Sequence, residues 1–439
     1  MSAVQRLEGQ RPVMDPDSLL LVLPVPFRRS GATLLVESQA CNGLDRWAEH
    51  FRKLVVACPV EPEKVARRRA DRDAYLPTEH IRAHARIDFV PLPWAYALGP
   101  FLRTYRRTRA TLAEKIRGST YLTFGLGGLV GDWAAVASLE AIRQCRPFSV
   151  WTDRVEHEVI KRDYLDHARV KRLYRRFKNR LVVAPLMKNL HRHILTRCDL
   201  GLLHGRDCFD TYAPYCRNPH VVHNIHTKPG DHVPADALAE KLRRVAAGGP
   251  LRLVYAGRVA EMKGPLDWVR VLATLRDRGV PFHATWLGDG PRLDDARAEV
   301  VRLGLTRSVE LPGHIGDRDL LLCALRAADL FVFCHKTPES PRCLIEALIS
   351  GCAPVGYDSP YSRGLLESAA DRLLVPRLDE TGLAELVYHL HQNRDELVGL
   401  IRACATLGSK YSDVEVFRPR GELIKEYLTP TSRDIPITV

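Results

Sequence analysis

Short runs of apolar residues alternate with longer amphipathic stretches along the first half of the chain. Strands that are buried on both faces of a parallel sheet read as continuous apolar runs, and apolar residues at three- and four-residue steps predict helices. The alternation therefore predicts an α/β protein with a parallel, doubly wound sheet. The strand-like runs are Leu19–Leu23, Lys53–Ala57, Ile87–Val90, Thr120–Thr123, Phe148–Trp151, Asp199–Leu203 and His220–His223.

A second unit of the same kind begins near residue 250. Leu251–Ala256 and Phe331–Cys334 are strand-like, and Cys343–Ile349 has a helical pattern that ends before Gly351. A chain of 439 residues is long enough for two such domains, and turn residues mark the boundary between them. We expect a flexible N-terminus at 1–17, a first domain at 18–226, a linker at 227–250, a second domain at 251–410 and a C-terminal helical segment at 411–439.

Two cations flank a glycine turn at the start of the second domain. Arg258 follows Gly257 directly after the strand-like run, and Lys263 precedes Gly264 at the start of the next helical stretch. Groups that follow a strand in this way meet at the carboxyl edge of the sheet. Both cations can therefore stabilise an anion that gains charge during a reaction. The alternative is an ordinary Arg and Lys in a strand-to-helix loop.

A proline-containing loop joins the run that ends at Cys334 to the next predicted helix. Helix N-termini bind phosphate or hydroxyl groups through free backbone N–H groups, and carboxylates there accept hydrogen bonds from hydroxyls. The alternative is that Glu346 complements the helix dipole and Glu339 is a solvated charge. The candidate binding residues of this loop and helix are Glu339, Ser340, Arg342 and Glu346.

With these motifs in order, the chain from Leu251 to Glu367 resembles the donor-binding domain of retaining glycosyltransferases of family 4, which have the two-domain GT-B fold. The resemblance implies that Arg258 and Lys263 grip the diphosphate of a nucleotide sugar. It also implies that the final helical segment, Val414 to Leu428, crosses back to pack on the first domain.

The resemblance assigns the remaining donor contacts to two more segments. The turn Gly313-His314-Ile315 corresponds to the family's nucleobase-binding turn, which makes His314 and Ile315 donor-binding candidates. The family's Glu-x7-Glu pair binds the donor sugar and the ribose, and its second member corresponds to Glu346. Six residues separate Glu339 from Glu346 here, and an ungapped alignment places Pro338 at the first position. We assign the first role to Glu339.

The first domain carries two further candidates. Gly31 lies in a turn after the first strand, where a glycine lets the backbone approach the donor phosphates. Its alternative is a plain turn glycine. Asp153 follows the strand-like run that ends at Trp151, where family members often have a histidine. It can orient the acceptor hydroxyl or stabilise positive charge on the sugar, or it caps the following helix. We interpret His157 as an ordinary helix residue.

Composition and charge bear on the compartment and the partner. The chain is 46% hydrophobic and 27% charged, without a signal peptide or an apolar run long enough to span a membrane, and its eleven cysteines lack metal-ligand spacing. Both observations favour a cytoplasmic protein. Within a net charge of +13, the segment from Lys161 to Arg197 carries twelve Lys or Arg and two Asp among regularly spaced apolar residues.

Such a basic amphipathic surface favours anionic lipid headgroups. The stretch Arg103–Arg109 can extend it. The alternatives are a solvated helix face and nucleic-acid binding, and we expect no nucleic acid because no recognised module is present. In the family resembled, the first domain binds the acceptor and often rests on the inner membrane surface. The patch therefore fits a lipid-linked or other glycan acceptor and a peripheral membrane location.

We expect a retaining hexosyltransferase that uses a UDP- or GDP-linked sugar, needs no cofactor and contains no metal site. Asp-x-Asp triplets occur at Asp15/Asp17, Asp71/Asp73 and Asp317/Asp319, each in a polar setting typical of chance. One alternative is an NAD-dependent oxidoreductase, but the first strand is not followed by Gly-x-Gly-x-x-Gly, and Gly125-Leu126-Gly127-Gly128 has the wrong spacing. A non-catalytic binding protein on the same fold is the other.

Overall fold

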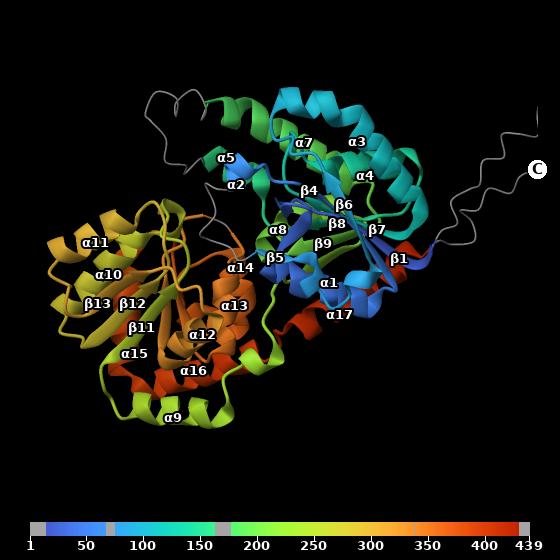
Figure 1. The fold of residues 1–439 in the computed structure, drawn as a ribbon. Coiled ribbons are helices and arrows are strands. Elements are labelled where there is room, and N and C mark those ends of the chain that lie inside the picture. The colour runs from blue at the N-terminus through green and yellow to red at the C-terminus, as the bar shows by residue number, and fades with distance from the viewer. Residues whose placement is uncertain (1–14, 67–74, 163–176, 338, 430–439) are drawn as a thin grey trace, which may run out of the picture.

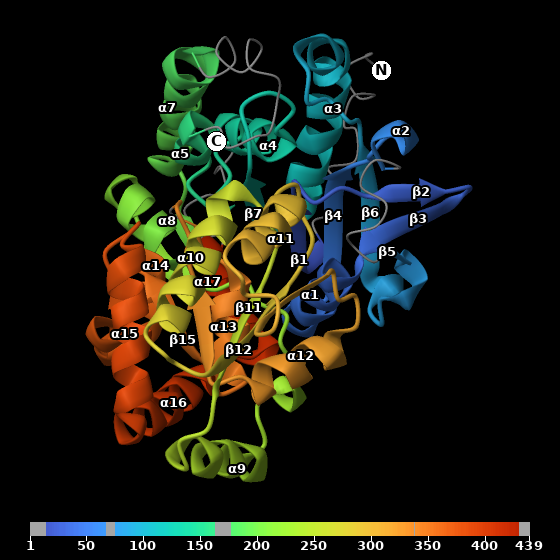
Figure 2. The same ribbon diagram turned by 90° about the vertical axis from the view of Figure 1, so that its left-hand side faces the viewer.

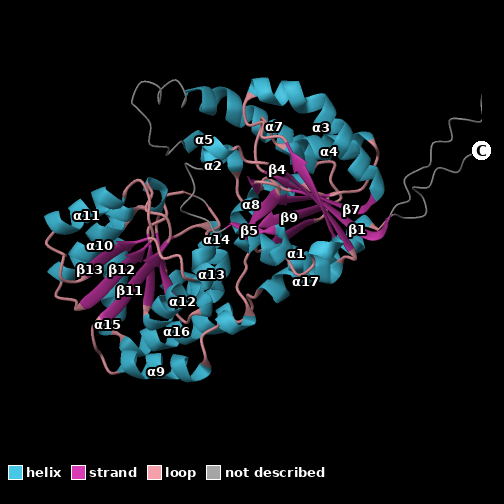
Figure 3. Cartoon of the chain, in the orientation of Figure 1, coloured by secondary structure: helices cyan, strands magenta, loops and turns pink. Residues whose placement is uncertain are grey.

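The computed structural model describes residues 15–66, 75–162, 177–337 and 339–429. Two α/β domains make up this part of the chain, and each has a parallel sheet between layers of helices (Figures 1 and 3). The expected doubly wound α/β architecture is therefore confirmed. The expected flexible segment at 1–17 lies outside the described residues up to position 14, and the first strand already begins at Asp15.

The first sheet has seven strands among the described residues, in the order β10-β9-β8-β7-β1-β4-β6, with every pairing parallel. Each strand predicted from the first half of the sequence is confirmed. Leu19, Leu20, Leu21 and Val22 of the interior strand β1 are completely buried, as a strand covered on both faces requires. The strands are β1 (Asp15–Val22), β4 (Lys53–Pro59), β6 (Ile87–Leu92), β7 (Ser119–Leu126), β8 (Ser149–Thr152), β9 (Leu200–His204) and β10 (Pro219–Val222).

Amphipathic helices cover both faces of this sheet. In α1, Cys41, Leu44, Trp47 and Ala48 recur at helical spacing and are buried, whereas the opposite face is polar. The helices of the first domain are α1 (Ser38–His50), α2 (Glu63–Ala66), α3 (Leu98–Gly118), α4 (Trp133–Arg143), α5 (Glu156–Arg162), α7 (Ala184–Leu195), with the π-helical turn η4 (Asn179–Val183) before it, and α8 (Gly205–Tyr212).

A small antiparallel sheet projects from the first domain (Figure 2) and was not predicted. It consists of β2 (Arg28–Ser30), β3 (Thr33–Glu37) and β5 (Tyr75–Pro77). Gly31 occupies the exposed turn between β2 and β3 with φ +60°, a conformation that glycine adopts at little cost. These strands are short and only partly buried, so they leave no continuous apolar run in the sequence.

The second sheet has the order β13-β12-β11-β14-β15-β16 among the described residues and is also entirely parallel. Its strands are β11 (Leu251–Ala256), β12 (Phe282–Leu287), β13 (Val309–Gly313), β14 (Leu330–Phe333), β15 (Ala353–Tyr357) and β16 (Leu374–Val375). Its helices are α10 (Pro265–Asp277), α11 (Leu293–Arg302), α12 (Arg318–Ala327), α13 (Arg342–Ile349), α14 (Pro360–Leu366), α15 (Glu380–Gln392) and α16 (Arg394–Gly408).

Two segments connect the domains. The segment predicted as a linker contains α9 (Ala235–Ala246), and Lys241 of this helix donates to the carbonyls of Ser350 and Gly351, so α9 belongs to the second domain. Helix α17 (Asp413–Leu428) returns to the first domain as expected (Figure 1). There Phe417 packs edge-on against Trp47, with 5.2 Å between ring centroids.

None of the helices in the described ranges is both long enough and apolar enough to cross a bilayer.

Candidate functional site

A cavity of about 360 Å³ lies between the two domains. Its first wall comes from loops at the carboxyl ends of parallel strands, where side chains of several strands meet. Its second wall is the loop before α13. Residues that line the first wall include Leu23, Pro24, Pro59, Gly127, Asp153 and His204, and those of the second wall are Glu339, Ser340 and Arg342. Four of the residues predicted for the site, Asp153, Glu339, Ser340 and Arg342, therefore line one cavity.

The glycine turns after β11 and β12 pack directly on each other. The N–H of Gly257 donates to the carbonyl of Leu287 at 2.9 Å, and the N–H of Val259 donates to that of Asp289 at 2.9 Å. A Cβ atom at Gly288 would overlap with the carbonyl oxygen of Gly257. The residue type at these turns is therefore fixed by close backbone approach. Arg258 follows Gly257 and is exposed at this edge of the sheet.

Lys263 and Glu339 form an ion pair between the segments that follow the neighbouring strands β11 and β14. Their Nζ and Oε1 atoms are 2.8 Å apart, and both side chains are only 14% exposed. Gly264 makes this possible, because its φ of +66° starts α10 and a Cβ there would overlap with the carbonyl of Cys334. Burial and the nearby charge of Lys263 lower the pKa of His335 well below its usual value, which keeps this neighbour neutral.

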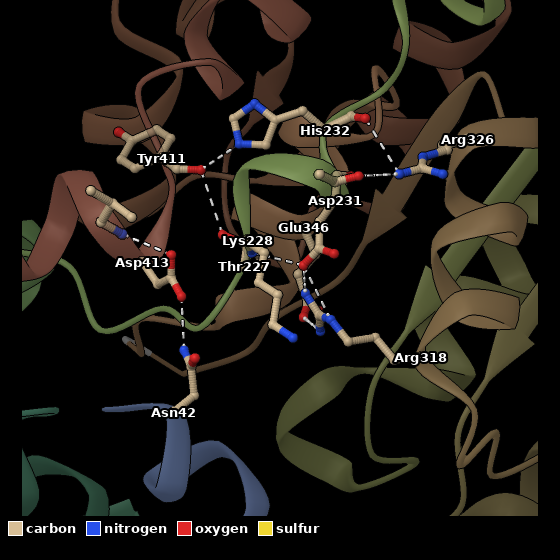
Figure 4. A network of polar contacts seen from close by, with 12 residues as sticks. Asn42, Thr227, Lys228, Asp231, His232, Arg318, Arg326, Glu346, Tyr411 and Asp413 are labelled. Atoms are coloured by element: carbon tan, nitrogen blue, oxygen red, sulfur yellow. Dashed lines mark hydrogen bonds and ion pairs between the residues drawn. The ribbon is translucent and has the colours of Figure 1, made fainter. Parts of the chain in front are cut away.

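Glu346, predicted to bind the ribose of the donor, pairs with a cation of the second domain. Its Oε1 lies 3.2 Å from Nη1 of Arg318, and the same guanidinium lies 2.7 Å from Asp231 (Figure 4). Arg318, at the first position of α12, was not singled out from the sequence. Its nearest sequence signal is Asp317, whose carboxylate caps α12 by accepting the N–H groups of Asp319 and Leu320.

Ser340 and Arg342 connect the second wall to the first domain. The Ser340 hydroxyl donates to the carbonyl of His204 at 3.2 Å, and Arg342 donates to the side chain of Gln39. The ring of His204 is buried and accepts the N–H of Asn224 through Nδ1 at 3.0 Å. Its Nε2 therefore carries the proton and donates to the Ser340 carbonyl at 3.3 Å. Burial lowers the pKa of His204, consistent with a neutral ring.

Asp153 lies directly after β8 and faces the cavity, as predicted. Its Oδ1 accepts a hydrogen bond of 3.2 Å from the side-chain amide of Asn224. His157 is buried in α5, where its Nδ1 lies 3.3 Å from the hydroxyl of Tyr212. The interpretation of His157 as a helix residue is thus confirmed.

Seven of the predicted residues do not line the cavity. Four of these, Gly257, Arg258, Lys263 and Glu346, have been described above, and the other three are Gly31, His314 and Ile315. Gly31 lies in the exposed turn of the β2–β3 hairpin (Figure 2) and is a turn glycine, as its alternative expected, while its role in donor binding stays a prediction. His314 and Ile315 follow β13, where His314 is exposed and Ile315 packs against the core of the second domain. Pro338 lies outside the described residues.

The glycine-rich turn after β7 was missed as a site element. The N–H groups of Gly127 and Gly128 donate to Oδ2 of Asp132 at 2.9 and 2.8 Å, and Oδ1 of Asp132 caps α4. These residues line the cavity together with Glu156. Burial raises the pKa of Glu156, although an ion pair of 2.6 Å with Arg154 opposes the shift. The sequence signal for this turn was its glycine cluster directly after a predicted strand.

Comparison with known proteins adds an independent observation. Residues 250–393 match the family described as glycosyl transferases group 1. The chain is 30% identical over 110 residues to 2-deoxystreptamine glucosyltransferase of Streptomyces kanamyceticus, covering 25% of this chain and 28% of that protein. It is 24% identical over 145 residues to 2-deoxystreptamine N-acetyl-D-glucosaminyltransferase of Niallia circulans, covering 33% and 37%. The chain thus matches less than half the length of these curated relatives.

Among solved structures, Anabaena Alr3699/HepE in complex with UDP superposes with a TM-score of 0.62 at 14% identity, over 93% of this chain and 100% of that chain. Similarity of fold at this level extends over both domains. The two-domain GT-B fold expected from the sequence is therefore confirmed.

Proposed function

We propose that this chain, whose residues 250–393 match the glycosyl transferases group 1 family, is a retaining hexosyltransferase that moves a sugar from a nucleotide donor to an acceptor hydroxyl. One observation carries the proposal: Glu339 and Asp153 line the same interdomain cavity, and Glu339 forms an ion pair with Lys263. Two carboxylates in one cleft, with a cation paired to one of them, suit a donor with a diphosphate and a hydroxyl-rich sugar.

In the proposed reaction, the bond between the anomeric carbon and the diphosphate oxygen breaks while the acceptor oxygen bonds to the same face of that carbon. The acceptor proton passes to the departing phosphate oxygen. A diphosphate that engages Lys263 competes with Glu339 for the ammonium group, which leaves the carboxylate available to sugar hydroxyls. Lys263 stabilises the charge on the leaving oxygen more than it stabilises the bound donor.

We propose UDP or GDP as the nucleotide part and no metal requirement, because Arg258 and Lys263 supply positive charge for the diphosphate. UDP or GDP should raise the thermal midpoint of the protein, since a ligand that binds only the folded state stabilises it. NAD should not. Mass spectrometry of the nucleotide sugar retained by the purified protein would then identify base and sugar. Stabilisation by NAD but by neither UDP nor GDP would contradict the proposed donor site. So would the absence of stabilisation by all three nucleotides.

We further propose that the first domain rests on an anionic membrane that carries the acceptor. Helix α3 and the η4–α7 segment lie on the same side of this domain (Figures 1 and 2). Helix α3 and the η4–α7 segment, together with residues 177–178 directly before η4, expose large apolar residues beside exposed cations. Residues 163–176 of the predicted basic segment lie outside the described residues. The apolar residues are Leu98, Leu102, Phe177, Leu181, Val182 and Leu186, and the cations are Arg103, Arg106, Arg107, Lys178, Arg180, Lys188 and Arg192.

The double substitution Leu102→Asp and Phe177→Asp tests this surface. The two side chains are 63% and 67% exposed, so the change leaves the core intact. Burial of each in lipid contributes roughly 1.5 kcal/mol or more. We therefore expect cosedimentation with vesicles that contain anionic phospholipid to weaken by at least about tenfold.

Val301→Asp is the matched control. Val301 is 66% exposed on α11 in the second domain, and its replacement should leave vesicle binding unchanged. Equal binding of the double variant and the unchanged protein would refute the membrane surface. Binding to RNA in place of vesicles would favour the nucleic-acid alternative.

A further inference from the structure

A smaller cavity of about 100 Å³ adjoins the interdomain cavity and shares Leu23, Asp153, Asn224 and Arg342 with it. The second domain contributes Arg342 to the lining of this cavity. Most of the other lining residues come from α1 and from strands of the first domain. The cavity has an apolar wall that also includes one residue of the returning helix α17. The wall residues are Phe27, Val36, Leu44, Trp47, Val56 and Phe417.

Three residues in this mostly apolar lining have a buried polar atom without a hydrogen-bond partner among the described residues. These atoms are Nε1 of Trp151, Oδ1 of Asn224 and Nδ1 of His226. Leaving such a group unpaired inside a protein is unfavourable, so each of these atoms calls for a partner. The indole N–H can only donate, and the amide oxygen can only accept. A ligand group that satisfies both must contain a donor and an acceptor of its own.

The size of the cavity and the polar groups in its lining limit which chemical groups it can bind. A water molecule occupies roughly 30 Å³ in the liquid, so the cavity holds about three or four non-hydrogen atoms and excludes a lipid chain. Burial lowers the pKa of His226 to about 3, and the cation Arg342 lies in the same lining. The carboxylates of Glu37 and Asp153 also belong to the lining. A protonated amine can only donate, so it would leave the indole N–H of Trp151 unpaired. A methyl group alone would leave the buried polar atoms unpaired.

We propose that this cavity binds a small acylamino substituent, such as acetamido, on the acceptor sugar. This inference rests on the proposed function, because an acceptor sugar exists only if the protein transfers a sugar. Asp153 lines both this cavity and the cleft in which transfer would occur. The amide N–H of the substituent can donate to Oδ1 of Asn224, and its carbonyl can accept from the indole N–H of Trp151. Its methyl group packs on the aromatic and aliphatic wall.

Saturation-transfer NMR tests the proposal without requiring turnover. Methyl N-acetylglucosaminide should show a strong acetamido methyl signal with the protein, and methyl glucoside should bind at least about tenfold more weakly. Trp151→Phe keeps an aromatic ring but removes the indole N–H, and Ala40→Leu fills the cavity that Ala40 lines. Both variants should lose the preference for the acetamido sugar by a similar factor.

Trp94→Phe is the matched control, because Trp94 packs on Tyr96 with 4.6 Å between ring centroids and does not line this cavity. It should retain the preference, and thermal melting of each variant should show that it is folded. Equal binding of the two sugars, or an unchanged preference in both cavity variants, would overturn the proposal. Release of nucleoside diphosphate, measured separately, tests the proposed function, and its failure would leave the NMR result intact.

Discussion

Replacing Lys263 by alanine should slow the release of nucleoside diphosphate by about 10²–10³-fold, the loss typical when one preorganised charge-stabilising group is removed. The ammonium group of Lys263 lies 2.8 Å from Glu339 and is 14% exposed, so its charge is weakly screened by solvent. This charge is needed most when the diphosphate departs. The turnover rate should therefore fall more than the affinity for the donor. Initial rates with the nucleotide sugar identified by mass spectrometry provide the measurement.

The alanine variant also leaves the carboxylate of Glu339 without its cation. The double variant Lys263→Ala with Glu339→Gln removes this uncompensated charge, so a folding defect can be separated from the loss of catalysis. Lys410→Ala is the matched control, because Lys410 pairs with Glu367 on an exposed surface and should retain full turnover. If Lys263→Ala and Lys410→Ala turn over the donor equally, the proposed role of Lys263 is wrong.

Replacing Asp413 by alanine should lower the free energy of unfolding by about 3 kcal/mol, the loss typical when one partner of a buried ion pair is removed. The carboxylate of Asp413 is 0% exposed and accepts hydrogen bonds from Asn42 at 2.9 Å and from Arg46 at 3.0 Å. Its backbone N–H donates to the carbonyl of Thr227 at 2.7 Å. Asp413 thus joins both interdomain segments to α1, and Figure 4 shows its contact with Asn42.

Urea unfolding followed by tryptophan fluorescence measures this effect, because Trp47 packs against α17. Glu415→Ala on the same helix is the matched control. Glu415 pairs with Arg418 at 2.6 Å on an exposed face, and such pairs contribute about 1 kcal/mol at most. A loss of stability in Asp413→Ala no larger than that in Glu415→Ala would show that the crossing of the two segments does not depend on this carboxylate.

The sequence was most informative where burial on both faces of a sheet imposed continuous apolar runs. The strands of the first sheet follow from such runs, and so do β11 and β14. The β2–β3 hairpin, with Gly31 in its turn, was not predicted because its strands are short and partly exposed. Helix α9 was missed because proline and glycine flank it, which suggested a linker throughout 227–250. Its amphipathic pattern became meaningful only once the second domain was there to pack against.

The linear sequence by itself determined the alternation of strands and helices, the two domains and the positions of Asp153, Lys263 and Glu339 at strand ends or helix starts, because these depend on local periodicity and turn chemistry. Only the tertiary structure decided which charges meet. Lys263 pairs with Glu339, Glu346 pairs with Arg318, and Gly127 lines the cleft whereas Gly31 does not. Such pairings join residues far apart in the chain, and they are set by sheet order and by the closure of two domains, neither of which a local pattern encodes.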